Sequence, residues 1–319
     1  MRCALLLRLG GVLLLGTFHC TSPRLSQRVD TIPLVTTDVD RFWAAYAAAL
    51  RDTAHADRIF QVQYIDRGSP GQHDYFRRKY QGNARRFARQ VLQRPHYYAS
   101  ARQTMQSAAD QKPRILAAFR QLQQLYPPVR FQPVYFLVGG FAGSTAQPVG
   151  LLLQVDGFTG PGVETAELSL VQRNRSGPVT LLPALIIHEM IHNTQQPMDG
   201  TLLSGVIREG MADFVAELVT GQPGTIARLH VYGNAHEREL WQAFRPVMLG
   251  ESPDHWLVNS KEETPDKPAD LGYYVGYKIC QAYYEKAPNK KQAVADMLTT
   301  KDFQALLAQS GYEQKMSAP

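Results

Sequence analysis

The segment His188-Glu189-Met190-Ile191-His192 carries the residue types in this chain that are best suited to metal chemistry. Residues four apart lie on the same face of a helix, so both imidazoles can bind one ion. Zinc accepts imidazole nitrogens at about 2.0–2.1 Å, and this helical spacing provides that geometry without strain. Glu189 lies beside the pair, where it can take a proton from water at the metal. The motif therefore predicts a zinc site with Glu189 as the general base.

The alternative interpretation is a pair of surface histidines beside a glutamate, with no metal. The apolar run Ala184-Leu185-Ile186-Ile187 argues against it, because this run would bury the start of the helix. Buried polar side chains without partners destabilise a protein, and a bound ion removes that cost. The sequence context therefore favours the metal site.

A catalytic zinc needs three protein ligands and one open position. One extended form of the motif has a glycine three residues after the second histidine and a further histidine three residues later. Gln195 and Met198 occupy those positions, which excludes that form. The other common third ligand is a glutamate on a following helix, and Glu209 comes after sixteen intervening residues, 193–208. We therefore expect the metal ligands to be His188, His192 and Glu209.

Asp213 follows Glu209 by four residues and shares its helix face. A carboxylate in that position can accept the second ring N–H of a ligating histidine and fix its tautomer. The alternative for Glu209 and Asp213 is a solvated acidic stripe that continues to Glu217.

The elements that must position these residues are mostly helical. Periodic apolar residues predict a first helix from Asp38, and the pattern predicts further helices over 83–93, 101–125, 181–196, 202–219, 237–248, 271–286, 291–298 and 303–309. Two β-prone runs, 134–138 and 150–155, flank a glycine-rich loop and predict a pair of antiparallel strands. The expected fold class is α+β, mostly helical, with a small antiparallel sheet before an HExxH helix.

His188-Glu189-x-x-His192 followed by Glu209-Gly-x-Ala-Asp213 resembles the gluzincin group of metallopeptidases. More narrowly, the chain resembles the bacterial predicted zinc-dependent proteases related to the gliding-motility lipoprotein. This narrower likeness rests also on 192–195, 271–278 and 310–312, and it covers the last two thirds of the chain. The resemblance implies a zincin-like metallopeptidase fold, an envelope location and one Zn²⁺ ion.

Gluzincins often place a tyrosine or histidine beyond the glutamate ligand to stabilise the oxyanion. The residues of suitable type in that part of the chain are Tyr273, Tyr274, Tyr277, His230, His236 and His255. An aromatic stripe belongs more often to a core than to an active site. In zincins an exposed strand beside the metal pairs with an extended peptide, and Gly150–Val155 is the strand expected to do so here.

The N-terminus predicts export. Residues 1–20 combine Arg2 with an interrupted apolar run and read as a signal peptide, too short for a stable membrane span. Cys20 lies where a lipoprotein signal has its cleavage-site cysteine, so a lipidated Cys20 would attach the protein to a membrane. The predicted organisation is a signal at 1–20, a tether at 21–37, an N-terminal helical region at 38–130 and a zincin-like catalytic region at 131–319. We expect the protein in the periplasm or cell envelope.

The charge balance by itself excludes no class of protein function. The net charge is +6, and no glutamate precedes Glu164, so the N-terminal half is arginine-rich. A solvated helical surface explains this better than a nucleic-acid site, since no nucleic-acid-binding motif accompanies it. Cys280 lies in an apolar helical stretch and is expected to be an inert core thiol.

The predicted function is hydrolysis of peptide bonds in a peptide or protein substrate by metal-activated water. The alternative is a non-hydrolytic zinc-binding envelope lipoprotein with a role in assembly or motility. A zinc-dependent amidase or other hydrolase acting on a non-peptide substrate is a third possibility. The intact Glu189 favours an enzyme, because a zinc-binding protein without activity does not need that acid.

Overall fold

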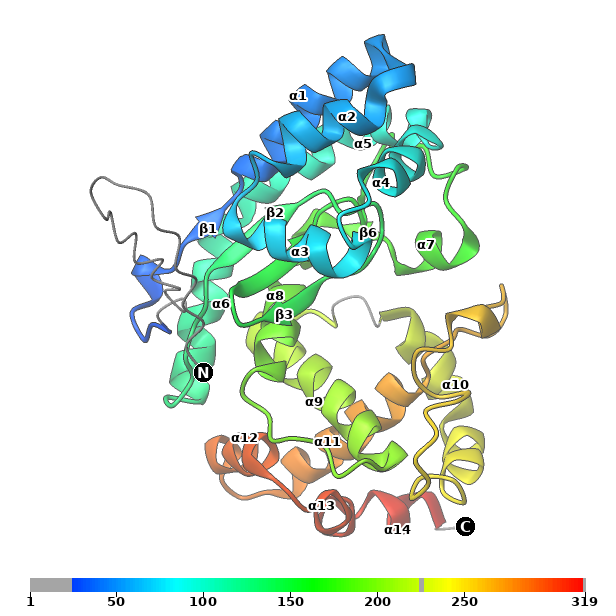
Figure 1. Ribbon diagram of the computed structural model, residues 1–319. Coiled ribbons are helices and arrows are strands. Elements are labelled where there is room, and N and C mark those ends of the chain that lie inside the picture. Colours follow the sequence, from blue (N-terminus) through cyan, green and yellow to red (C-terminus); the bar gives the residue numbers. More distant parts are fainter. Residues whose placement is uncertain (1–24, 224–226, 318–319) are drawn as a thin grey trace, which may run out of the picture.

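A small mixed sheet lies between two groups of helices (Figure 1). The computed structural model describes residues 25–223 and 227–317. The helices within residues 37–106 gather in the upper part of the view, and those within residues 202–220 and 272–317 lie in the lower part. The predicted mostly helical α+β class is confirmed at this level.

The main sheet has the strand order β1-β2-β4-β3. Strands β1 and β4 both run parallel to β2, whereas β3 runs antiparallel to β4. A second, two-stranded sheet pairs β5 with β6 in parallel. The strand bounds are β1 Leu34–Val35, β2 Val134–Leu137, β3 Thr145–Gln147, β4 Gly150–Gln154, β5 Phe158–Thr159 and β6 Gly177–Pro178.

The predicted antiparallel pairing of the two β-prone runs is wrong, because β2 and β4 are parallel. The cause is β3, which the sequence analysis did not predict. The chain leaves β2 and turns toward the edge of the sheet through Gly140 and Gly143, which both have positive φ. The chain then runs back as β3 and turns tightly into β4, so β4 points the same way as β2. The prediction that Gly150–Val155 forms the edge strand is also wrong, since β4 is interior and β3 forms the edge.

The N-terminal helices surround an aromatic core in which Phe42 packs against Phe60, Tyr64 and Tyr98. Acidic residues in the first turn of α1 favour its start. The bounds are α1 Thr37–Arg51, α2 Ala56–Phe60, α3 Pro70–Tyr80, α4 Ala84–Leu92, α5 Pro95–Gln106 and α6 Lys112–Leu125. A π-helical turn over Gln61–Ile65 extends α2, and a 3₁₀ turn over Ser107–Gln111 divides the predicted helix 101–125 into α5 and α6.

The C-terminal helices form the second group, in which α9 packs between α8 and α11. Their bounds are α7 Leu170–Arg175, α8 Leu182–His192, α9 Leu202–Thr220, α10 Ala227–Phe244, α11 Gly272–Lys286, α12 Lys290–Thr299, α13 Phe303–Ser310 and α14 Tyr312–Ser317. Cys280 is free and fully buried on α11. Among the described residues, no helix has both the length and the apolar character needed to cross a membrane.

Helices α9 and α11 approach closely at two glycines. A Cβ atom added to Gly210 would lie 2.0 Å from the backbone nitrogen of Tyr277. One added to Gly276 would lie 1.9 Å from the carbonyl oxygen of Val206. Backbone atoms cannot move aside as a flexible side chain can, so the two glycines set the spacing between these helices.

The described part of the predicted tether, residues 21–37, contacts the rest of the fold. Val29 and Ile32 are buried, and β1 pairs with β2. The predicted signal at 1–20, with Cys20, lies outside the described residues.

Candidate metal centre

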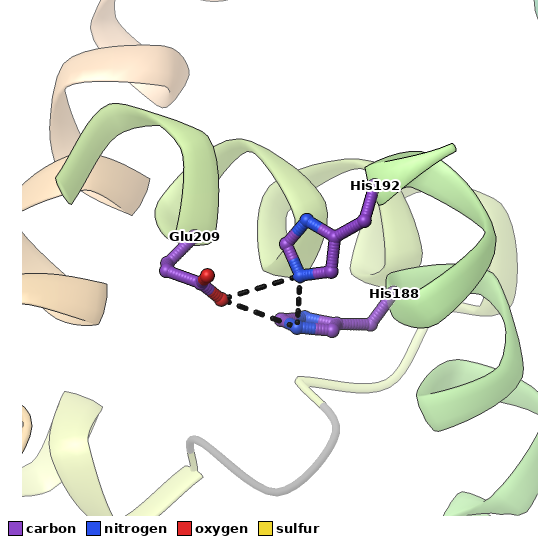
Figure 2. A group of neighbouring side chains, drawn as sticks. All are labelled: His188, His192 and Glu209. Atoms are coloured by element: carbon purple, nitrogen blue, oxygen red, sulfur yellow. Dashed lines mark hydrogen bonds and ion pairs between the residues drawn. The ribbon is translucent and has the colours of Figure 1, made fainter. Parts of the chain in front are cut away.

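His188 and His192 lie on α8, and Glu209 lies on the adjacent helix α9. Pro183 in the first turn of α8 suits a helix start, because that turn has no partner for a backbone N–H. The faces of α8 away from the two histidines are buried by apolar side chains, those of Ile186, Ile187, Met190 and Ile191. Figure 2 shows that both imidazoles point toward the Glu209 carboxylate.

The three side chains present one atom each to a common point. The Nε2 atoms of His188 and His192 are 3.1 Å apart. Oε2 of Glu209 is 3.5 Å from Nε2 of His188 and 3.3 Å from Nε2 of His192. Tetrahedral zinc with bonds of about 2.0–2.1 Å requires ligand atoms about 3.3–3.4 Å apart. The triangle therefore has the dimensions of one face of such a tetrahedron.

The other nitrogen of each imidazole contacts an oxygen atom. His188 Nδ1 lies 2.8 Å from Oδ1 of Asp213, and His192 Nδ1 lies 3.0 Å from Oε1 of Gln195. The Gln195 amide is oriented by its own NH₂ group, which donates to the carbonyl oxygen of Arg208. Because oxygen acceptors require a proton on Nδ1, the neutral imidazoles carry lone pairs on Nε2. Two imidazole lone pairs and a carboxylate oxygen thus converge, and this donor set fits zinc.

The electrostatics of the group fit a cation as well. Burial would lower the pKa of His188, but Asp213 and Glu209 outweigh it and raise that pKa well above its usual range. Burial would raise the pKa of Glu209, but hydrogen bonds from His188 and His192 hold it far below its usual range. Without a metal, a proton shared in this group therefore balances part of the carboxylate charge. A bound cation would take over that role.

Glu189 lies beside the triangle and lines a cavity of about 570 Å³ together with His188, Asp213 and Tyr273. Its side chain is partly exposed. In the described part of the chain, the Glu189 carboxylate has no hydrogen bond or ion pair. A carboxylate without a partner in such a cavity is available to accept a proton.

Of the tyrosines and histidines predicted for oxyanion stabilisation, Tyr273 lines this cavity. Its ring stacks on that of His188, with centroids 6.3 Å apart and planes 13° from parallel. Burial and the nearby Glu209 carboxylate raise the pKa of Tyr273 well above its usual range, so the hydroxyl keeps its proton. The group is therefore a hydrogen-bond donor at neutral pH.

The other candidates of this set have different neighbours. The Tyr274 hydroxyl donates to Asn234, and the Tyr277 ring packs edge-on against His230. His236 and His255 each contact a glutamate at the surface. None of these five residues lines the cavity among the residues that the structure describes.

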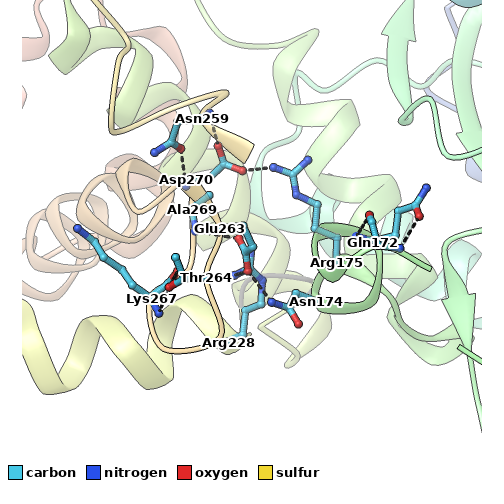
Figure 3. A network of polar contacts seen from close by, with 11 residues as sticks. Gln172, Asn174, Arg175, Arg228, Asn259, Glu263, Thr264, Lys267, Ala269 and Asp270 are labelled. Carbon is cyan, nitrogen blue, oxygen red and sulfur yellow. Dashed lines mark hydrogen bonds and ion pairs between the residues drawn. The ribbon is translucent and has the colours of Figure 1, made fainter. Parts of the chain in front are cut away.

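A polar network links α7 to α10 and to the loop before α11 (Figure 3). Arg175 of α7 contacts the Asp270 carboxylate. Glu263, whose side chain is 1% exposed, accepts from Arg228 at 2.9 Å and from Asn174 at 2.6 Å. Arg175, Arg228 and Asp270 line the cavity, so one of its walls is held by paired charges.

Sequence reasoning missed Gln195 as the partner of His192. Its position three residues beyond His192 is the signal that would have identified it. It also missed the network around Arg175 and Glu263, whose members lie up to 95 residues apart in the chain.

Comparison with known families agrees with this geometry. A family model described as gliding motility protein GldB matches residues 23–225, well over half of the chain, including α8 and α9. The chain belongs to the gliding motility protein GldB family. A second model, described as a predicted Zn-dependent protease, matches residues 156–304. The resemblance stated from the sequence is thereby confirmed.

The two family matches cover different parts of the site. The GldB match ends before α11, whereas the protease match extends through α8, α9 and α11, and so includes Tyr273. No curated protein and no solved structure matches this GldB family member. The zincin-like fold that the resemblance implies therefore stays a prediction.

Proposed function

We propose that this GldB-family protein is a zinc-dependent peptidase. The observation that carries the proposal is the convergence of His188 Nε2, His192 Nε2 and Glu209 Oε2 within 4.8 Å of one another beside a cavity lined by Glu189. The match to a family described as predicted Zn-dependent proteases supports the same conclusion. In this proposal His188, His192 and Glu209 hold Zn²⁺, and Glu189 is catalytic.

Zinc held by this triad would supply Lewis acidity, which polarises carbonyl groups and makes water more acidic. Glu189 accepts the proton of the attacking water and later delivers it to the leaving amine. The Tyr273 hydroxyl donates a hydrogen bond to the oxygen on which negative charge develops. Asp213 and Gln195 keep the two imidazoles in the tautomer that a metal needs.

The edge strand supports a peptide as the substrate. Among the described residues β3 is the edge strand of the main sheet, and it contacts α8, which carries Glu189. An extended peptide can add to such an edge through backbone hydrogen bonds, which fix its direction without selecting its side chains. β3 replaces Gly150–Val155 in this role.

We further propose that the protein is an exported envelope lipoprotein. Membership in a family named for a lipoprotein supports this location. In the proposal a lipidated Cys20 attaches the chain to a membrane, and residues 1–20 are its signal. Labelling intact cells with a radioactive fatty acid tests it. Label on the wild type that disappears in Cys20→Ser supports the proposal, and label retained by Cys20→Ser contradicts it.

The second candidate function is a non-hydrolytic zinc-binding envelope lipoprotein that serves assembly or motility. The extent of the GldB match, whose description names gliding motility, favours it. The free Glu189 carboxylate in the cavity favours the peptidase, since a purely structural zinc site has no use for a proton acceptor.

A peptide-library digest separates these functions. Zinc-loaded wild-type protein should cleave library peptides and so generate new termini. Glu189→Gln should bind the same amount of zinc, but its activity should be lower by about 10²-fold or more. Zinc-loaded protein that cleaves no peptide would contradict the peptidase proposal. Activity on non-peptide amides alone would reassign the same site to an amidase.

A further inference from the structure

One corner of the cavity is built from three polar side chains on different elements. Lys79 comes from α3, Ser144 immediately precedes β3, and Gln154 ends β4. All three line the cavity that Glu189 and His188 also line. The inference below concerns this corner and rests on the proposed peptidase function.

Gln154 presents its NH₂ group as an available donor. Its Oε1 atom accepts from the backbone N–H of Gly143 at 2.9 Å and from the Tyr75 hydroxyl at 3.4 Å. These two contacts fix which end of the amide is oxygen. The Nε2 atom lies near Gly157, another cavity residue, and has no acceptor among the described residues.

Ser144 and Lys79 are donors as well. The Ser144 Oγ atom accepts from the backbone N–H of Gln154 at 3.2 Å, which leaves its own hydrogen free to donate. Nζ of Lys79 lies next to the same loop, 3.9 Å from where a Cβ on Gly143 would stand. Within residues 25–223 and 227–317, Lys79 forms no ion pair and no hydrogen bond.

The other cations of the cavity are already neutralised. Arg175 contacts Asp270, and Arg228 contacts Glu263. Among the described residues, Lys79 therefore has no carboxylate partner and lies next to two further donors. The Glu189 carboxylate lines the same cavity but forms no ion pair with Lys79. Such a corner is complementary to an anionic acceptor, and a carboxylate can take hydrogen bonds from all three groups.

We propose that the corner formed by Lys79, Ser144 and Gln154 binds a carboxylate of the peptide substrate. Ser144 of this corner directly precedes the edge strand β3, so a peptide paired with that strand would pass beside the corner. The site therefore takes acidic peptides, with the carboxylate supplied by an Asp or Glu side chain or by the free C-terminus.

Peptide binding to zinc-loaded Glu189→Gln tests this without requiring turnover. The probes are fluorescently labelled alanine-rich octapeptides with one Glu at each position in turn, the same series with Gln, and each series with a free or an amidated C-terminus. Fluorescence anisotropy gives each Kd. At least one Glu or free-carboxylate peptide should bind about tenfold tighter than its neutral counterpart. The Glu series and the C-terminal series identify which carboxylate is bound.

Two variants in the Glu189→Gln background assign the preference to the corner. Lys79→Met keeps the apolar stem and should abolish the tenfold difference while neutral peptides bind as before. Gln154→Glu can still accept from Gly143, but it replaces a donor with a negative charge, so it should also abolish the preference. Lys112→Met is the matched control, because Lys112 is exposed and lies outside the cavity.

The outcomes separate this proposal from the proposed function. Equal binding of acidic and neutral peptides, a preference that survives Lys79→Met and Gln154→Glu, or no binding of any probe would overturn the carboxylate corner. Selective binding without cleavage by the zinc-loaded wild type would keep the corner and refute the peptidase. Cleavage without any preference for acidic peptides would keep the peptidase and refute the carboxylate corner.

Discussion

Nδ1 of His188 lies 2.8 Å from Oδ1 of Asp213, and Asp213 lies one turn after Glu209 on the same helix. A single helix face thus supplies one proposed metal ligand and the partner that orients another. Asp213 is 6% exposed, so the contact is shielded from competing water. The arrangement fixes the His188 ring and leaves its Nε2 atom directed at Glu209.

We expect Asp213→Asn to weaken zinc binding by about 10–100-fold, because a neutral amide holds the His188 tautomer less firmly. Competition with a chromogenic chelator measures the affinity. Glu217→Gln, one turn further along α9, is the matched control and should bind zinc as the wild type does. Wild-type affinity in Asp213→Asn would contradict the orienting role.

The pH dependence of the zinc-free protein follows from the raised pKa of His188. A histidine whose pKa is higher in the folded than in the unfolded state stabilises the fold below its unfolded value of 6.5. That contribution disappears as the pH rises through the folded-state pKa. Zinc must displace the same proton, so its apparent affinity should rise with pH. The Tm difference between zinc-loaded and zinc-free protein should therefore widen between about pH 6 and pH 9. A Tm difference that stays constant over this range would mean that His188 does not lose a proton when zinc binds.

Tyr273→Phe should lower kcat by about 10–10³-fold with little change in zinc content, since it removes only a donor to the developing charge. Steady-state kinetics and elemental analysis provide the two readouts. Tyr274→Phe is the control, because its hydroxyl donates to Asn234 rather than toward the cavity. An unchanged kcat in Tyr273→Phe would remove this residue from the mechanism.

Gly210→Ala and Gly276→Ala should each destabilise the protein by about 1–3 kcal/mol or more, because the new methyl group meets backbone atoms. The better helix propensity of alanine, worth up to about 1 kcal/mol, would not offset this clash. Denaturant unfolding measures the change. At Gly160 the nearest atom to an added Cβ is Thr104 Oγ1 at 3.5 Å, so Gly160→Ala should be tolerated. Equal stabilities for all three variants would mean that the close approach of α9 and α11 does not depend on these glycines.

Much of the metal centre could be predicted from the sequence because it depends on local periodicity. Helical spacing alone brings His188 and His192 together and places Asp213 one turn after Glu209. The length of chain between His192 and Glu209 is sufficient for the return to an adjacent helix. These relations need no knowledge of the rest of the fold.

The sheet could not be predicted in the same way. The direction of β4 relative to β2 depends on β3, a three-residue strand too short to give a periodic signal. Helix α3 was not predicted, although Ser69 caps it and Pro70 begins it. The corner of Lys79, Ser144 and Gln154 could not be predicted for the same reasons, since Lys79 lies on α3 and Ser144 immediately precedes β3.

The most direct test of the central claim is the zinc content of purified protein, measured by elemental analysis in the wild type, His192→Ala and Glu209→Ala. We predict one zinc per chain in the wild type and a loss or strong weakening of binding in both variants, with all three proteins folded by circular dichroism. A folded wild type that binds no zinc even after reconstitution would contradict the account. Zinc retained in full by Glu209→Ala would show that Glu209 is not the third ligand.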